Sequence, residues 1–188
     1  MNKVYGYKNE YTSIREDISR YVISYGLEPL EDKVHATWYE TYQYKKYVSG
    51  ISFESVRDAI IADIDAQTDE KILNGYQWTI LHGDDAGKTI NVWLSKENQS
   101  NFKAKHDTAT QYPQLTTYPI IYKVGEVEEE DGLKRPVYEH FQDVNELAQF
   151  YLGGLAYIER TLSEGWVRKD SIDFEPYKAY FQDNDDNT

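Results

Sequence analysis

Residues 83–89 are the first place where residue types and spacing could do chemistry. They read Gly-Asp-Asp-Ala-Gly-Lys-Thr, and two glycines before Lys-Thr could cradle a phosphate with backbone N–H groups. A phosphate-binding loop needs four residues between its glycines and a helix directly after it, whose N-terminus faces the anion. Here three residues separate the glycines, and a strand-like run at 90–94 follows. We therefore predict that this segment is the turn of a β-hairpin.

Acidic and histidine side chains are the next candidates. The connector at residues 125–135 holds an acidic run, 126–131, whose carboxylates could bind Ca²⁺ or Mg²⁺. The spacing of an EF-hand loop is absent, which favours a solvated turn between two strands. The four histidines are scattered, and no two of them have the spacing of a helical zinc site. We predict no metal and no cofactor.

Signatures of nucleophilic catalysis are missing as well. The chain has no cysteine, which excludes thiolate nucleophiles, disulfides and cysteine-ligated metals. It also has no Gly-x-Ser-x-Gly motif. A carboxylate pair for glycoside hydrolysis stays open, because such pairs come from distant positions and 33 acidic residues are available. We expect a protein that is not an enzyme.

An aromatic run at residues 38–47 carries the strongest hint of binding. Rings occur on both sides of this expected strand, so one face is core and the other is covered or binds something. Tyrosine offers rigid contact area at low entropic cost, which suits protein interfaces, and its rings could also stack on sugars. A strand buried on both faces within the chain is the alternative. The candidate contact residues are Trp38, Tyr42, Tyr44 and Tyr47.

Composition narrows the classes of partner. The 188 residues carry a formal net charge of −13, and the aromatic content is 15 %, which is enough for a sizeable core. Such an acidic chain has no basic surface for nucleic-acid backbones or anionic membranes. No apolar run is long enough to span a bilayer, and residues 1–17 lack the apolar stretch of a signal peptide. We expect neither nucleic-acid nor membrane partners.

Hydrophobic spacing predicts the elements that position these residues. Ile14, Ile18, Val22 and Tyr25 recur at helical spacing until Gly26, which predicts a first helix. Ser52, Ser95 and Asp143 are expected to begin three more helices, the last of which ends at Gly165. Period-two patterns predict strands at residues 34–44, 76–82, 88–94, 117–124 and 136–141.

This order predicts an α+β fold of antiparallel β-hairpins packed with three to four amphipathic helices, because hairpins replace the crossovers of a doubly wound sheet. We expect an N-terminal part at residues 1–49, made of a helix and the aromatic strand, that could serve interaction. A module at 50–175 and a short acidic tail at 176–188 would follow.

The segment 53–174 resembles an uncharacterised domain family of tailed bacteriophages and prophages, often encoded beside tail and fibre genes. The similar pieces are Asn-Gly-Tyr-Gln-Trp at 74–78, Val-Trp-Leu-Ser-Lys-Glu-Asn-Gln-Ser-Asn-Phe-Lys-Ala at 92–104, Phe-Tyr-Leu-Gly-Gly-Leu-Ala-Tyr-Ile at 150–158 and Gly-Trp-Val-Arg-Lys-Asp-Ser-Ile-Asp at 165–173. The resemblance implies a role in the virion or its assembly and no catalytic residues.

We therefore expect a non-enzymatic virion structural or accessory protein, an adaptor of the tail, collar or fibre. It would be assembled in the host cytoplasm and reside in the virion. Its partners would be other phage structural proteins and further copies of itself, since virion subunits are commonly homo-oligomers. Two alternatives stay open: a fibre-assembly chaperone absent from the mature virion, and an acidic host-inhibitory or DNA-mimic protein. A glycan-binding module is a weaker third.

Overall fold

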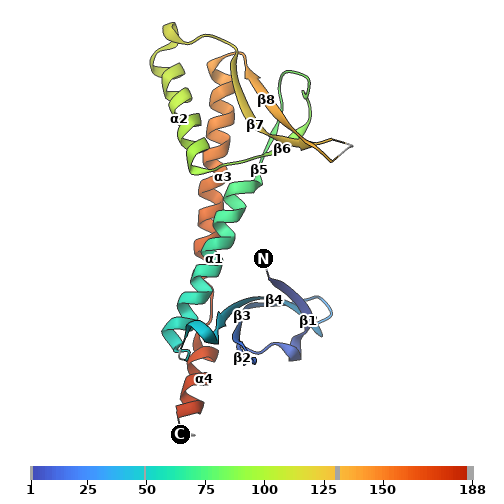
Figure 1. Ribbon diagram of the computed structural model, residues 1–188, viewed down its shortest axis with the longest axis vertical. Coiled ribbons are helices and arrows are strands. Elements are labelled where there is room, and N and C mark those ends of the chain that lie inside the picture. The colour runs from blue at the N-terminus through green and yellow to red at the C-terminus, as the bar shows by residue number, and fades with distance from the viewer. Residues whose placement is uncertain (1, 49, 130–131, 186–188) are drawn as a thin grey trace. The chain divides into compact units, whose positions relative to one another are not determined.

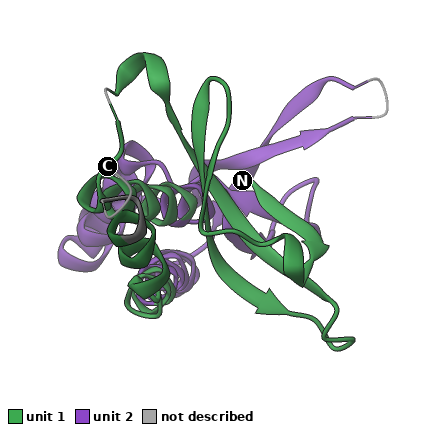
Figure 2. Ribbon diagram, turned by 90° about the horizontal axis from the view of Figure 1, so that it is seen from below, with its two compact units in different colours: residues 1–67, 164–188 green, residues 68–163 purple. Residues whose placement is uncertain are grey.

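The chain forms two compact units that both combine antiparallel strands with helices (Figures 1 and 2). The computed structural model describes residues 2–48, 50–129 and 132–185. Unit 1 comprises Met1–Gln67 and Glu164–Thr188, and unit 2 comprises Thr68–Ser163. The predicted α+β class with antiparallel hairpins is confirmed.

Unit 1 is a four-stranded antiparallel sheet packed on helices. Its strands are β1 (Lys3–Tyr7), β2 (Ile14–Glu16), β3 (Arg20–Pro29) and β4 (His35–Tyr44), in the spatial order β1-β4-β3-β2. Figure 1 shows this sheet strongly curved. Ile23 and Tyr25 of β3 share a buried core with Ile60 and Ile64 of α1 (Phe53–Gly75) and with Tyr177 of α4 (Glu175–Asp185).

The predicted first helix is wrong, because its residues form β2, a turn and β3. Ile14 pairs with Ile23 across the hairpin, and Ile18, expected on the buried face of a helix, is 95 % exposed in the turn. The run Tyr-Val-Ile-Ser-Tyr at residues 21–25 is rich in β-branched and aromatic residues, which favour strands. Gly26, at φ +65°, lies in a bulge of β3 instead of ending a helix.

Unit 2 contains two hairpins and two main helices. The hairpins are β5 (Tyr76–Thr79) with β6 (Thr89–Val92), and β7 (Ile120–Glu128) with β8 (Lys134–Phe141). The helices are α2 (Lys96–Gln111) and the larger part of α3 (Val144–Asp170), whose residues from Glu164 onward belong to unit 1. As predicted, Ser95 caps α2 by accepting the N–H of Asn98 at 3.1 Å.

Phe150 of α3 lies at the centre of the unit 2 core. Its ring centroid is 4.9 Å from that of Phe102, 5.1 Å from that of Trp78 and 5.3 Å from that of Phe141. Glu139, fully buried beside these rings, accepts hydrogen bonds from the indole of Trp78 and from the backbone N–H groups of residues 81, 82 and 140, at 2.7–3.1 Å. Because four donors surround its carboxylate, Glu139 can be buried without a cation.

The C-terminal elements differ from the prediction in two places. Helix α3 runs through Gly165 to Asp170, since one glycine costs a helix only about 1 kcal/mol. Most of the expected acidic tail forms α4, whose Tyr177 is 2 % exposed and donates its hydroxyl to the Ser24 carbonyl at 2.6 Å. Residues 186–188 of that tail lie outside the described residues.

The compact units also divide the chain at other places than the boundary expected at residues 49 and 50. Residues 50–67 lie in unit 1, and so does the segment after residue 163. Within the described residues, none of the helices has the length and apolar content that crossing a membrane requires.

Candidate functional site

Two of the four predicted contact residues are tied to the acid between them on β4. Trp38 Nε1 donates to Glu40 Oε1 at 3.3 Å, and the Tyr42 hydroxyl donates to Glu40 Oε2 at 3.2 Å. Trp38 is only 4 % exposed, and the Arg20 guanidinium covers the Tyr42 ring at 4.2 Å from its centroid. Burial, followed by the nearby Glu40 charge, raises the pKa of Tyr42. Trp38 thus belongs to the core, and Tyr42 is half-buried.

The other two predicted residues are open to solvent. Tyr44 is 46 % exposed and Tyr47 is 75 % exposed. The Lys46 ammonium lies over the Tyr47 ring, 4.5 Å from its centroid. A partner could therefore reach Tyr44 and Tyr47, and their role in binding stays a prediction.

A second aromatic group in unit 1 was missed by the sequence reasoning. Tyr5 and Tyr7 are 65 % and 51 % exposed, and their rings flank the His35 ring at centroid distances of 5.4 and 4.6 Å. Val34, beside His35, is 56 % exposed. We call these four residues the tyrosine surface. The alternation Val-Tyr-Gly-Tyr at residues 4–7, which places both rings on one side of a strand, could have revealed it.

Asp32 holds the tyrosine surface in place. Its Oδ1 accepts the backbone N–H groups of Val34 and His35, each at 2.9 Å, and its Oδ2 lies 2.6 Å from His35 Nδ1. The hydrogen bonds from the His35 backbone and ring lower the pKa of Asp32 to about 2. The imidazole is therefore oriented by a carboxylate that stays ionised at neutral pH.

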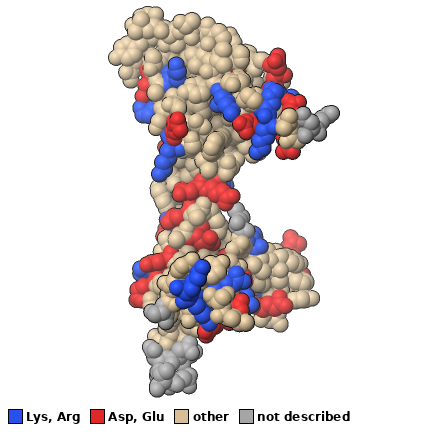
Figure 3. Space-filling model, in the orientation of Figure 1, with Lys and Arg blue, Asp and Glu red and all other residues tan. Residues whose placement is uncertain are grey.

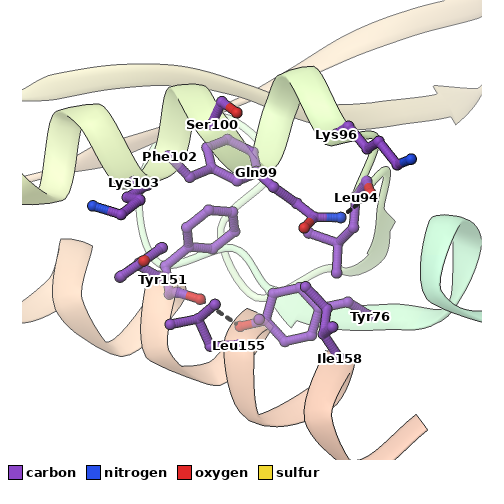
Figure 4. Close-up of a pocket in the computed structure, with 12 residues that line it drawn as sticks. Tyr76, Leu94, Lys96, Gln99, Ser100, Phe102, Lys103, Tyr151, Leu155 and Ile158 are labelled. Atoms are coloured by element: carbon purple, nitrogen blue, oxygen red, sulfur yellow. Dashed lines mark hydrogen bonds between the residues drawn. The ribbon is translucent and has the colours of Figure 1, made fainter. Parts of the chain in front are cut away.

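Unit 2 contains an apolar pocket of about 330 Å³ between α2 and α3 (Figure 4). Buried side chains form its floor, among them Tyr76, Leu94, Phe102 and Phe150. The α3 side is completed by Tyr151, Gly154, Leu155 and Ile158, and the α2 side by Lys96, Gln99, Ser100 and Lys103. The volume and the apolar lining with few polar groups are typical of small-molecule sites.

The floor of this pocket is fixed by a hydroxyl inside the core. The Tyr76 hydroxyl donates to the Phe150 carbonyl at 2.9 Å, and burial raises the pKa of Tyr76 to about 12. A Cβ on Gly153 would lie 2.5 Å from that hydroxyl, whereas one on Gly154 would meet the Tyr76 ring at an ordinary 3.5 Å. The Gly-Gly pair of α3 therefore lets β5 approach this helix closely through Tyr76.

The segment that superficially fits a phosphate loop is the hairpin turn that we predicted. The Ile80 N–H donates to the Lys88 carbonyl, and the Gly87 N–H donates to the Ile80 carbonyl. Asp85, 5 % exposed, accepts both terminal guanidinium nitrogens of Arg135 and the Lys88 ammonium, each at 2.8 Å. These cations hold the pKa of Asp85 well below its usual range. The lysine that would bind phosphate is paired with an acid.

Histidine and acidic side chains of unit 2 also form pairs outside this turn. His82 Nε2 lies 2.9 Å from Glu146 Oε1, and within the described ranges no further acid or histidine joins this pair in a cation-binding group. Among the described residues, no three histidine, aspartate or glutamate side chains are placed to hold a metal. The acidic connector includes residues 130 and 131, which lie outside the described residues.

Comparisons with models of known protein families, with curated proteins and with solved structures give no match. The resemblance of residues 53–174 to a phage domain family therefore stays a prediction, and so does the absence of enzymatic activity.

Proposed function

We propose that this chain is a non-enzymatic bacteriophage virion protein, a structural or accessory adaptor of the tail, collar or fibre. It acts by protein–protein contact with other phage structural proteins and with copies of itself. The phage assignment comes from the sequence resemblance, and the mode of action comes from the aromatic surfaces of unit 1.

The observation that carries the mode of action is the tyrosine surface. Tyr5 and Tyr7 keep more than half of their surface exposed, and both rings pack against His35. Exposed, rigid tyrosines next to an apolar side chain such as Val34 are typical of interface centres. Tyr44 and Tyr47 add exposed rings at the end of β4.

The charge distribution supports this proposal over the DNA-mimic alternative. On the face drawn in Figure 3, basic side chains lie among acidic ones in both units. Several acids are neutralised locally, as in the pairs of Glu16 with Lys45 and of Asp65 with Lys169 at 2.6 and 2.7 Å. A surface that imitates duplex phosphates needs a long array of one sign, which such pairs interrupt.

Mass spectrometry of purified phage particles tests the proposal. We expect the protein in mature virions at a stoichiometry matching another tail, collar or fibre component. Its absence from particles would overturn the structural role and would support the chaperone, provided that fibre solubility then depends on co-expression with this chain.

Complementation locates the contact. A deletion phage supplied with the double variant Tyr5→Ser and Tyr7→Ser should incorporate about tenfold less protein than with the wild type, because interface tyrosines are frequent hot spots. Tyr138→Ser is the matched control, since Tyr138 is a strand tyrosine of unit 2 that is 46 % exposed. Equal incorporation of the two variants would contradict the proposal that the tyrosine surface makes this contact.

A further inference from the structure

The apolar pocket of unit 2 has a polar rim on one side only. Lys96, Gln99, Ser100 and Lys103 recur on α2 at the spacing that places side chains on a single face of a helix. Figure 4 shows Lys96 and Lys103 at the two ends of this rim. The opposite wall, on α3, is formed by rings and aliphatic groups. The pocket is therefore amphipathic.

The charges of the rim are all of one sign. The lining residues belong to the described part of the chain, and none of them is an aspartate or a glutamate. This is notable in a chain with 33 acidic and 20 basic residues. Lys103 is paired with Asp107 one turn further along α2, whereas the described residues provide Lys96 with no ion pair. An exposed ammonium at the mouth of an apolar pocket is complementary to a single anionic group.

The form of the pocket favours a small occupant. Its floor consists of side chains that are almost fully buried beneath α2 and α3, such as Phe102 at 3 % and Phe150 at 1 % exposure. A helical partner would instead need an apolar groove that continues over several turns. A volume of about 330 Å³ lies near the lower end of the range for small-molecule sites.

We propose that this pocket binds a small amphiphilic carboxylate, with its aliphatic chain on the rings of the floor and its carboxylate at Lys96. The inference does not rest on the proposed virion role. It assigns a ligand class to unit 2, whereas the virion proposal concerns contacts of unit 1. The two can therefore fail independently.

Calorimetric titration of the full chain with sodium decanoate, below its micelle-forming concentration, tests the proposal. We expect saturable one-to-one binding with a Kd on the order of 0.1–1 mM, in keeping with a ligand of this size. Decyltrimethylammonium, which has an alkyl chain of similar length and the opposite charge, should bind at least about fivefold more weakly. Absence of decanoate binding, or equal binding of the two amphiphiles, would overturn the proposal.

Two pairs of variants locate the ligand. Lys96→Glu should weaken decanoate binding about fivefold, while Lys105→Glu, with the same charge change at an exposed position of α2 away from the pocket, should leave it within about twofold. Leu155→Gln should weaken binding through the apolar wall. Leu152→Gln is its control, because Leu152 is 54 % exposed on α3 and does not line the pocket.

Circular dichroism of the four variants shows that each is folded before titration. Equal losses within either pair would place the ligand elsewhere and would contradict the assignment. Saturable binding of an acidic amphipathic peptide without binding of decanoate would likewise replace the small-molecule assignment with a peptide site.

Discussion

Aromatic residues serve different purposes in the cores of the two units. In unit 1 the hydroxyl groups matter: Tyr25 donates to Asp63 at 2.6 Å and accepts from Gln67 at 3.0 Å, and Tyr177 donates to the Ser24 carbonyl. Burial raises the pKa values of Tyr25 and Tyr177, and the neighbouring carboxylate of Asp63 adds to this effect at Tyr25.

In unit 2 the rings themselves pack together around Phe150, and two polar groups lie among them: the Glu139 carboxylate accepts four N–H donors, and the Tyr76 hydroxyl donates to the Phe150 carbonyl. Hydrogen bonds are directional, so the unit 1 core is specified by geometry as well as by volume, whereas the ring cluster depends on volume. Removal of the Tyr25 hydroxyl alone should therefore harm unit 1, whereas removal of the Phe150 ring should harm unit 2 most.

Phe150→Ala should give the largest effect. It removes the ring at the centre of the unit 2 cluster, where the side chain is 1 % exposed, and should lower the free energy of unfolding by about 3–5 kcal/mol. Hydrogen–deuterium exchange resolved to peptides measures the loss within residues 68–163. Trp166→Ala, at a position 58 % exposed, is the control and should change stability by less than about 0.5 kcal/mol. A loss below 1 kcal/mol would contradict the central role of Phe150.

Glu139→Gln tests the role of the carboxylate that is buried beside the rings of unit 2. The amide has one oxygen for the four N–H donors, and its NH₂ group faces donors instead of acceptors. We expect a loss of about 2–3 kcal/mol in urea unfolding, because buried donors are left unpaired. An unchanged urea midpoint would show that the ring cluster alone holds the two hairpins and α3 together.

Asp85→Asn tests how the hairpin turn of unit 2 is held. Because the folded pKa of Asp85 lies below the ordinary value of about 3.9, its pair with Arg135 contributes fully above about pH 4. The contribution is lost as the pH falls through the folded pKa. At pH 7 the variant should be about 1–2 kcal/mol less stable than the wild type, and the difference should shrink toward pH 2. A pH-independent difference in urea unfolding would contradict this origin.

Tyr25→Phe should give the smallest effect, and in unit 1 only. It removes the hydroxyl and keeps the ring, while Gln67 and Asp63 keep their own hydrogen bond at 2.8 Å. The expected loss is about 1 kcal/mol, measured by hydrogen exchange of the β3 peptides. Tyr5→Phe, at an exposed position, should be neutral and serves as the control. Equal results for the two variants would remove the contrast between the cores.

Local signals in the sequence were enough to predict most of the fold. The helix starts at Ser52 and Ser95 and the hairpin turn at residues 83–87 agree with the structure, since each depends on neighbours within a few residues. The prediction of a first helix was wrong because Ile14 and Ile23 pair across a hairpin. The apolar residues before Gly26 fit the spacing of a helix as well as that of a strand.

The candidate sites were harder to predict because they depend on tertiary placement. Trp38 and Tyr47 belong to the same aromatic run, yet Trp38 is buried and Tyr47 is exposed. This difference depends on the curvature of the sheet and on the elements that pack against it. The pocket rim needs α2 and α3 to be brought together, and no local pattern in residues 96–103 or 151–158 specifies that. The tyrosine surface, in contrast, had a local signal in the alternation at residues 4–7.

The discontinuity of unit 1 has a consequence for synthesis on the ribosome. The sheet of β1 to β4 emerges first from the ribosome. Tyr177, which lies in the core of unit 1 and donates a hydrogen bond to the Ser24 carbonyl, follows 153 residues after Ser24. Unit 2 is contiguous and can close as soon as residue 163 has emerged, because nascent domains fold as units. Part of the apolar face of the sheet therefore stays uncovered until α4 has been translated. When the ribosome stalls before α4, or when the chain is truncated there, chaperones should bind the uncovered apolar face of unit 1, whereas unit 2 should be folded.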